Sequence, residues 1–219
     1  MKSVQYDLFY AHDSASMGVR VILEEIGVPY QLIQSTIAAD EPRPPEQLAI
    51  NPNGWVPVLV WGDNAMYECA AIAIFLCDRH PEANLAPKID EAARELYLQT
   101  LVYFSSSVQI AFQLNYHPER FADTSADEPS AQRRGIRRLR ETWKVIDDQI
   151  GDNEWVLGER FSAVDIYLFM LTTWLSASRG HPMANEFPNV KRIADAVMAR
   201  PSVQLVYEKW IAEQDGNES

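Results

Sequence analysis

The chain has 219 residues, enough for one large or two small domains with a buried core, and its 47% hydrophobic and 23% charged residues are typical of a folded protein. Its 31 acidic and 19 basic residues give a formal net charge of -12, which argues against nucleic-acid and membrane partners, because both favour basic patches. The amino terminus lacks the apolar run of a signal peptide, and no window approaches the roughly 20 apolar residues that span a bilayer. A cytoplasmic location is therefore expected.

The sequence predicts neither a disulfide nor a metal site. Cys69 and Cys77 stand eight residues apart in one apparent helix, which separates them by about 12 Å along the helix axis. Bridged cysteines need Cα atoms within about 7 Å of each other, so both are expected to be free thiols. The four histidines are scattered, and no Cys/His cluster has the spacing of metal ligands.

The first 80 residues alternate between strand and helix patterns. Residues 17–26, for example, carry a helical apolar stripe, and Gly27 follows as a stop signal. The predicted elements are a strand over residues 4–10, a helix over 17–26, a strand over 30–33, a short helix over 46–50, a hairpin of 58–61 and 65–67, and a helix over 68–78. Strand, helix and strand imply a parallel pair, to which the hairpin adds two antiparallel strands. Such a small mixed sheet with packed helices resembles the thioredoxin fold.

Strand signals vanish after a predicted linker at residues 83–88. Long helical patterns follow over residues 89–116, 130–150, 162–176, 189–199 and 202–212, and short connections between long helices predict a bundle. The expected organisation is an α/β thioredoxin-like domain over residues 1–82 and an all-α helical bundle domain over residues 89–219. Within the bundle, Ser162 and Asp165 have the spacing of a capping box at the start of an apolar helix.

Two short motifs lie near the end of the first predicted domain. In residues 56–59 (Val-Pro-Val-Leu), a proline begins a strand, where its missing N–H costs least. Because X–Pro bonds are the ones in which the cis form is cheap, the spacing leaves cis and trans Val56–Pro57 both open. The second motif, residues 68–76, begins eleven residues after Pro57 and opens a helix at Glu68. A carboxylate there is also a favourable charge in a first helical turn.

Together these motifs resemble the glutathione site of the cytosolic glutathione transferase family. The resemblance implies that Val56 and Pro57 pair with the cysteinyl backbone of glutathione, and that Glu68 and residue 69 hold its γ-glutamyl end. Amides at a helix start attract carboxylates, and Glu68 can accept a bond from an ammonium group. The family has serine where this chain has Cys69, a weaker donor, whose alternative role is that of a small buried helix residue. Trp55 is expected to pack against the bound tripeptide or to cover the hairpin.

The loop over residues 10–17 is the candidate for thiol activation. A hydroxyl directed at the sulfur of glutathione stabilises the thiolate, and the candidates are Ser14 and Ser16, with an ordinary helix cap as the alternative. Family members with a catalytic serine or cysteine place it at or beside Asp13, or at Ala15, so neither residue is reproduced. Tyr10 aligns imperfectly with the catalytic residue of tyrosine-type members. A carboxylate beside a thiolate raises the thiol pKa, which opposes activation.

The resemblance also implies a second pocket, between the domains, for a hydrophobic electrophile. Its expected lining is Tyr10 with Phe104, Val108 and Phe112, three residues spaced by four on one helical face, for which bundle core is the alternative. The run of arginines at 133–138 is expected to be a solvated helix face. The predicted activity is conjugation of glutathione to small hydrophobic electrophiles by a homodimer without a metal cofactor. The alternatives are a glutathione- or ligand-binding protein of the same fold with little turnover and a glutathione-dependent disulfide reductase, which would lack a loop cysteine.

Overall fold

The computed structural model describes residues 5–38 and 40–217. The chain divides into two compact units, one formed by residues 1–88 together with 198–219 and the other by residues 89–197. The end of the predicted 89–219 domain, residues 198–219, therefore belongs with the amino-terminal unit. This association joins distant parts of the chain, and local sequence patterns do not predict it.

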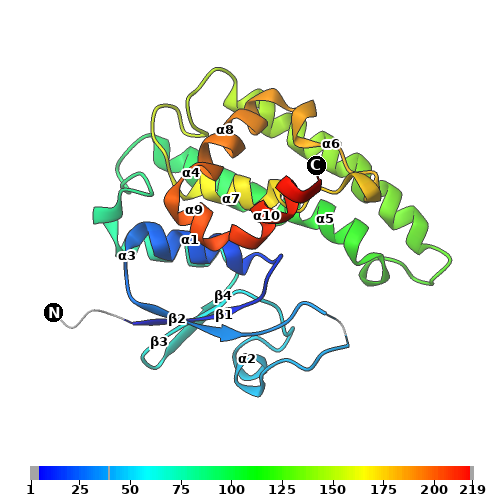
Figure 1. The fold of residues 1–219 in the computed structure, drawn as a ribbon, viewed down its shortest axis with the longest axis horizontal. Helices are drawn as coiled ribbons and strands as arrows, with labels where there is room; N and C mark the ends of the chain where they lie inside the picture. Colours follow the sequence, from blue (N-terminus) through cyan, green and yellow to red (C-terminus); the bar gives the residue numbers. More distant parts are fainter. Residues whose placement is uncertain (1–4, 39, 218–219) are drawn as a thin grey trace. The chain divides into compact units, whose positions relative to one another are not determined.

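The amino-terminal unit is built on a four-stranded sheet in the order β2–β1–β3–β4 (Figure 1). Strands β1 and β2 are parallel, and the pairs β1–β3 and β3–β4 are antiparallel, which confirms the predicted mixed thioredoxin-like sheet. The strands are β1 (Tyr6–Tyr10), β2 (Tyr30–Gln34), β3 (Val58–Trp61) and β4 (Asn64–Tyr67).

Three helices accompany this sheet: α1 (Ser16–Ile26), α2 (Pro45–Ile50) and α3 (Cys69–Arg79). Figure 1 draws α1 and α3 on one face of the sheet and α2 on the other. Helix α1 ends at Gly27 as predicted, because this residue adopts a φ of 74° and its N–H bonds to the carbonyls of Leu23 and Glu24.

The carboxy-terminal segment packs on α1 through α9 (Pro201–Val206), and α10 (Glu208–Asn217) follows it. Arg200 donates two hydrogen bonds, of 2.8 and 2.7 Å, to the carboxylate of Glu25 on α1. Ser202 donates a further bond to the same carboxylate. The single helix predicted over residues 202–212 is thus two helices that meet at Tyr207, whose side chain is buried.

The second unit is helical, as predicted. Its first long stretch is continuous from α4 (Ala93–Tyr103) through a π-helical segment (Phe104–Val108) to α5 (Gln109–Tyr116). Helix α6 approaches α5 closely at Gly135, where an added Cβ would lie 2.8 Å from the carbonyl oxygen of Ala111. The remaining helices are α6 (Glu128–Ile150), α7 (Ala163–Thr172) and α8 (Pro188–Met198).

The predicted capping box is present at the start of α7. The Asp165 carboxylate accepts bonds from the Ser162 N–H (2.8 Å) and the Ser162 hydroxyl (3.0 Å), and also from the Val156 N–H (2.9 Å). Burial raises the pKa of Asp165 to about 6, although these donors oppose the shift. The box therefore holds the preceding loop as well as the helix start.

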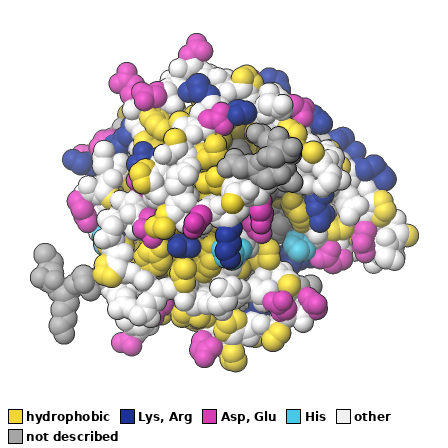
Figure 2. Space-filling model, viewed as in Figure 1, with side chains coloured by type: hydrophobic (Ala, Val, Ile, Leu, Met, Phe, Trp, Pro, Cys, Tyr) yellow, Lys and Arg dark blue, Asp and Glu magenta, His cyan; other side chains and the backbone are white. Residues whose placement is uncertain are grey.

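The arginine run lies on α6. Figure 2 shows dark blue side chains along the edge at which Figure 1 draws this helix, and Arg133, Arg134, Arg137 and Arg138 are exposed. Arg138 pairs with Glu141 at 2.8 Å. This face is solvated, as expected for a charge run on a helix surface.

Candidate functional site

The two segments selected from the sequence meet at one edge of the sheet. In the strand register, Phe9 lies opposite Val58 and Val58 lies opposite Tyr67. Continued by one residue, the same register places Tyr10, Pro57 and Glu68 together, since antiparallel partners step in opposite directions. The end of β1, the start of β3 and the end of β4 therefore bring the loop over residues 11–15 beside the segment over residues 51–68, which we call the clamp.

The clamp is held from behind by uncharged side chains. The Val56–Pro57 peptide bond is cis, one of the two alternatives open from the sequence. The carbonyl of Trp55 accepts hydrogen bonds from the amides of Gln47 and Asn51, each 3.2 Å long. Gln47 is completely buried and also accepts a 2.6 Å bond from the hydroxyl of Ser35. This network fixes the backbone before Val56 and leaves the Trp55 ring 43% exposed.

Arg43 joins the other side of the clamp to the preceding loop. Its guanidinium donates to the carbonyl of Gly54 at 3.2 Å and to that of Ala38 at 2.6 Å. Gly54 adopts a φ of 70°, which favours glycine. The clamp is thus a positioned loop whose shape depends on contacts across more than ten residues of sequence.

Glu68 occupies the residue before α3 in a backbone conformation that few residues adopt. Its φ is 79°, a region that costs on the order of 1–3 kcal/mol for a residue other than glycine. The side chain is exposed and makes no capping hydrogen bond to its own helix. Glu68 therefore presents a carboxylate outward from the start of α3, a placement that strained residues of binding sites commonly have.

Cys69 lies directly behind Glu68 and is 6% exposed. Its thiol donates to the carbonyl of Ala15 at 3.5 Å, which links the start of α3 to the start of α1. Cys77 is buried as well, and neither cysteine forms a disulfide. The geometry favours the structural alternative for the Cys69 side chain, because its bond is directed into the protein.

The two serines of the loop form hydrogen bonds within the loop itself. Ser14 is 6% exposed and Ser16 is fully buried. The Ser14 hydroxyl donates to the carbonyl of Ala11 at 2.8 Å and lies 2.6 Å from the Ser16 hydroxyl. The Ser16 hydroxyl accepts from the Ala11 N–H at 3.0 Å. These bonds make the serines the internal support of the loop, and a catalytic role for either hydroxyl stays a prediction.

The exposed residues of the loop are His12 and Asp13. Asp13 adopts a φ of 56°, and its N–H donates to the sulfur of Met17 at 3.3 Å. His12 lies against Tyr10, whose hydroxyl is 3.4 Å from the histidine Nδ1. Burial raises the pKa of Tyr10, although the nearby Arg20 guanidinium opposes the rise, so its hydroxyl keeps its proton at neutral pH.

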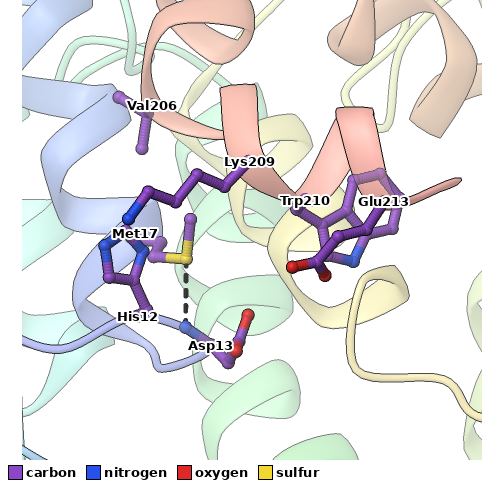
Figure 3. Close-up of a pocket in the computed structure, with 7 residues that line it drawn as sticks. All are labelled: His12, Asp13, Met17, Val206, Lys209, Trp210 and Glu213. Carbon is purple, nitrogen blue, oxygen red and sulfur yellow. Dashed lines mark hydrogen bonds between the residues drawn. The ribbon is translucent and has the colours of Figure 1, made fainter. Parts of the chain in front are cut away.

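A cavity of about 100 Å³ opens beside this loop, within the amino-terminal unit (Figure 3). The loop supplies an imidazole and a carboxylate, and α10 supplies an amino group, a carboxylate and an indole ring. Met17 and the α9 residue Val206 complete the wall. The lining consists of His12, Asp13, Met17, Val206, Lys209, Trp210 and Glu213. The α10 residues Lys209, Trp210 and Glu213 were not among the residues predicted from the sequence, because no local pattern marks them as part of a site.

The residues expected to line the second pocket are buried within their own units. Tyr10 is 2% exposed, Phe104 and Val108 are fully buried, and Phe112 is 2% exposed. Phe104 packs against Tyr167 with ring centroids 5.6 Å apart, and the ring of Phe112 contacts Tyr116, Trp174 and His181. The geometry favours the alternative that this stripe is bundle core.

Neither a metal site nor a membrane span is found among residues 5–38 and 40–217. No group of three or more His, Cys, Asp or Glu residues is arranged there to hold a metal ion. No helix in this part of the chain is long and apolar enough to cross a membrane.

The sequence matches two family models. The model described as the N-terminal domain of glutathione S-transferase matches residues 14–79, and that of the C-terminal domain matches residues 103–201. The uncharacterized GST-like protein YncG of Escherichia coli strain K12 is 31% identical over 186 residues, which cover 83% of this chain and 87% of the relative. The chain belongs to the glutathione S-transferase family.

Solved structures agree with this assignment. A glutathione transferase homolog from Sulfitobacter, solved with bound glutathione, superposes with a TM-score of 0.85 at 27% identity, covering 94% of this chain and 98% of that one. The bacterial glutathione transferase BphK, solved as a ternary complex, superposes with a TM-score of 0.77 at 25% identity and covers 93% of this chain and 98% of its own.

Proposed function

We propose that this protein binds glutathione at the clamp and transfers it to small hydrophobic electrophiles. The observation that carries the proposal is the strand register that aligns Phe9, Val58 and Tyr67 and so brings the next residues, Tyr10, Pro57 and Glu68, to one sheet edge. The Cys69–Ala15 hydrogen bond joins the starts of α3 and α1 there. The glutathione bound in the Sulfitobacter homolog supports the same ligand for this fold.

In this proposal, each part of the clamp recognises one part of the tripeptide. The backbone of Val56, which Gln47 and Asn51 hold through the neighbouring Trp55 carbonyl, pairs with the cysteinyl residue. The exposed carboxylate of Glu68 accepts from the γ-glutamyl ammonium, and the first amides of α3 receive the γ-glutamyl carboxylate. The buried Cys69 supports this helix start, and Trp55 covers the ligand with its exposed face.

The proposed reaction is a displacement at an electrophilic carbon. The thiol of glutathione loses its proton to solvent, and the thiolate forms a sulfur–carbon bond while a leaving group, such as chloride, departs with the electron pair. The protein's contribution is to hold the tripeptide and to stabilise the thiolate. No metal is required in this sequence of steps.

The test is calorimetric titration with glutathione followed by a turnover assay with a chloronitrobenzene. Binding with turnover above the uncatalysed rate is the expected result. Absence of glutathione binding would contradict the whole proposal, whereas binding without turnover across a panel of electrophiles would favour the second candidate function.

That second candidate is a glutathione-binding protein with little catalysis. It is favoured by the serine hydroxyls, which bond within the loop, and by the exposed Asp13 carboxylate beside the proposed thiolate position. A glutathione-dependent disulfide reductase is less well supported, because Cys69 and Cys77 are both buried.

We further propose that the protein is a cytoplasmic homodimer, an arrangement typical of its family. Each unit carries exposed large apolar side chains that a partner copy could cover, among them Ile37 and Leu48 in one unit and Val102 and Val145 in the other. Sedimentation analysis would measure the mass directly, and a monomer at micromolar concentration would contradict this assembly.

A further inference from the structure

We infer that His12 is the residue that stabilises the glutathione thiolate, with Tyr10 as the positioning residue that sets its tautomer. The inference rests on the proposed function. It assigns to an exposed imidazole the role for which the sequence suggested the hydroxyls of Ser14 and Ser16.

In the observed geometry, neither serine hydroxyl is available to donate a hydrogen bond to the thiolate. Ser14 and Ser16 each have one hydroxyl proton. Each hydroxyl can donate either to the carbonyl of Ala11 or to the oxygen of the other serine. A hydroxyl that donates to a carbonyl has no second proton for a thiolate. His12 lies on the same loop but is exposed, so its ring can reach a ligand without breaking these bonds.

Tyr10 determines which nitrogen of His12 carries the proton. The Arg20 guanidinium lies over the Tyr10 ring, 5.5 Å from its centroid, and it can only donate hydrogen bonds, so it takes no proton from the Tyr10 hydroxyl. The single hydroxyl proton of Tyr10 is then free for Nδ1 of His12, 3.4 Å away. With Nδ1 as an acceptor, a neutral His12 carries its proton on Nε2, where it is a donor.

The cavity beside the loop offers this donor to an anion. Figure 3 draws the amino group of Lys209 pointing toward the imidazole of His12. Two donors that face a common space favour a negative charge between them. The carboxylates of Asp13 and Glu213 also line this cavity and oppose the effect, while Met17 and Trp210 supply apolar surface for the electrophile.

The chemistry requires no proton transfer to the protein. The thiol proton leaves to solvent, the Nε2–H of His12 donates to the sulfur anion, and the thiolate then attacks the electrophile as its leaving group departs. His12 contacts the reacting sulfur, whereas Tyr10 acts through His12.

The first experiment compares His12→Ala and His12→Gln with the unsubstituted protein, and His117→Ala serves as a control on a histidine of the helical unit. Calorimetry measures glutathione binding, ultraviolet absorbance measures the bound thiolate, and turnover is measured with a chloronitrobenzene. His12→Ala is expected to bind glutathione but to lose turnover about ten- to hundredfold, the effect of one hydrogen bond to a charged group. His12→Gln should recover part of the loss, because its amide also donates.

The outcomes test the role of His12 separately from the proposed function. If His12→Ala binds glutathione and keeps both the thiolate absorbance and the turnover of the unsubstituted protein, the role of His12 is overturned while the proposed function stands. If the unsubstituted protein binds no glutathione, the proposed function itself fails.

The second experiment tests Tyr10 by a property that a purely structural role would not change. The nitrogen chemical shifts of His12 report its tautomer, and Nε2–H is expected to dominate in the folded protein. Tyr10→Phe should shift His12 toward a mixture of tautomers and lower turnover, with glutathione affinity retained. Unchanged nitrogen shifts in Tyr10→Phe would overturn the positioning role.

Discussion

The clamp and the loop meet at the same sheet edge but use their polar groups in opposite ways. The amides of Gln47 and Asn51 support the backbone of the clamp from behind, and Glu68 is exposed. In the loop, Ser14 and Ser16 bond to the loop's own backbone, and only His12 and Asp13 are exposed. The difference shows that a ligand site needs supporting residues as much as contacting ones, and that similar side chains can serve either purpose.

The largest expected effect lies in the clamp. Glu68→Ala should lower glutathione affinity about ten- to hundredfold, because an ammonium loses its charged acceptor. Calorimetric titration measures the change, with the exposed Glu95 of α4, outside the clamp, replaced by alanine as the control. Equal affinities for Glu68→Ala and the unsubstituted protein would remove Glu68 from the binding site.

The next effect separates support from catalysis in the loop. Ser16→Ala should lower the free energy of unfolding by about 1–3 kcal/mol, because the buried Ala11 N–H loses its acceptor. Ser14→Ala should cost less, since the backbone N–H from which its hydroxyl accepts, that of Ser16, is held by a longer bond of 3.2 Å. Denaturant unfolding measures both, with the exposed Ser106 replaced by alanine as the control. Unchanged stability together with lost turnover would instead mean that the substituted serine bonds to the thiolate. The distinction between supporting serines and ligand-facing residues would then be wrong.

A smaller effect is expected at Asp13. Asp13→Asn removes a carboxylate from the cavity but keeps a side chain that tolerates a φ of 56°. The thiol pKa of bound glutathione should therefore fall, and turnover at neutral pH should rise a few-fold. The gain should shrink at high salt, which screens exposed charges. A lower turnover in Asp13→Asn would mean that the carboxylate assists the reaction.

The smallest effect concerns pH. It compares the carboxy-terminal segment, which an ion pair holds on α1, with the clamp. Burial alone would raise the pKa of Glu25, but its hydrogen bonds from Arg200 and Ser202 lower it below the ordinary value of 4.5. A lowered pKa stabilises the folded state above pH 4.5, and this contribution is lost as the pH falls through the folded value. The clamp is supported by the amides of Gln47 and Asn51 and by the guanidinium of Arg43, and none of these supporting groups is a carboxylate.

Hydrogen exchange checks this last prediction. As the pH falls below 4.5, residues 201–213 should lose protection before residues 47–57 do. Glu25→Gln, compared at each pH, should remove the difference. Simultaneous loss of protection in both segments of the unsubstituted protein would contradict it.

Features set by neighbouring residues were predictable from the sequence. The end of α1 at Gly27 and the capping box of Ser162 and Asp165 depend on backbone conformation and hydrogen bonds within a few residues. The positions of Pro57 and Glu68 relative to the hairpin also followed from short-range spacing. The clamp and the sheet can therefore be predicted without knowledge of any tertiary contact.

Features set by distant residues were not predictable. The bonds from Arg200 to Glu25 and from Cys69 to Ala15 join parts of the chain separated by 175 and 54 positions. The division of α9 from α10 and the cavity beside His12 depend on that packing. Nothing in the local spacing distinguished a serine that supports the loop from one that faces a ligand.

The sequence by itself thus determined the family, the mixed sheet followed by a helical unit, and the clamp motif, because periodicity, turns and caps are local. Only the tertiary structure showed that the loop serines, Cys69 and the stripe from Phe104 to Phe112 are buried, and that the chain's end joins the amino-terminal unit. The physical reason is that burial and hydrogen-bond partners arise from long-range packing, and in this protein that packing leaves His12 and Asp13 as the exposed residues of the loop.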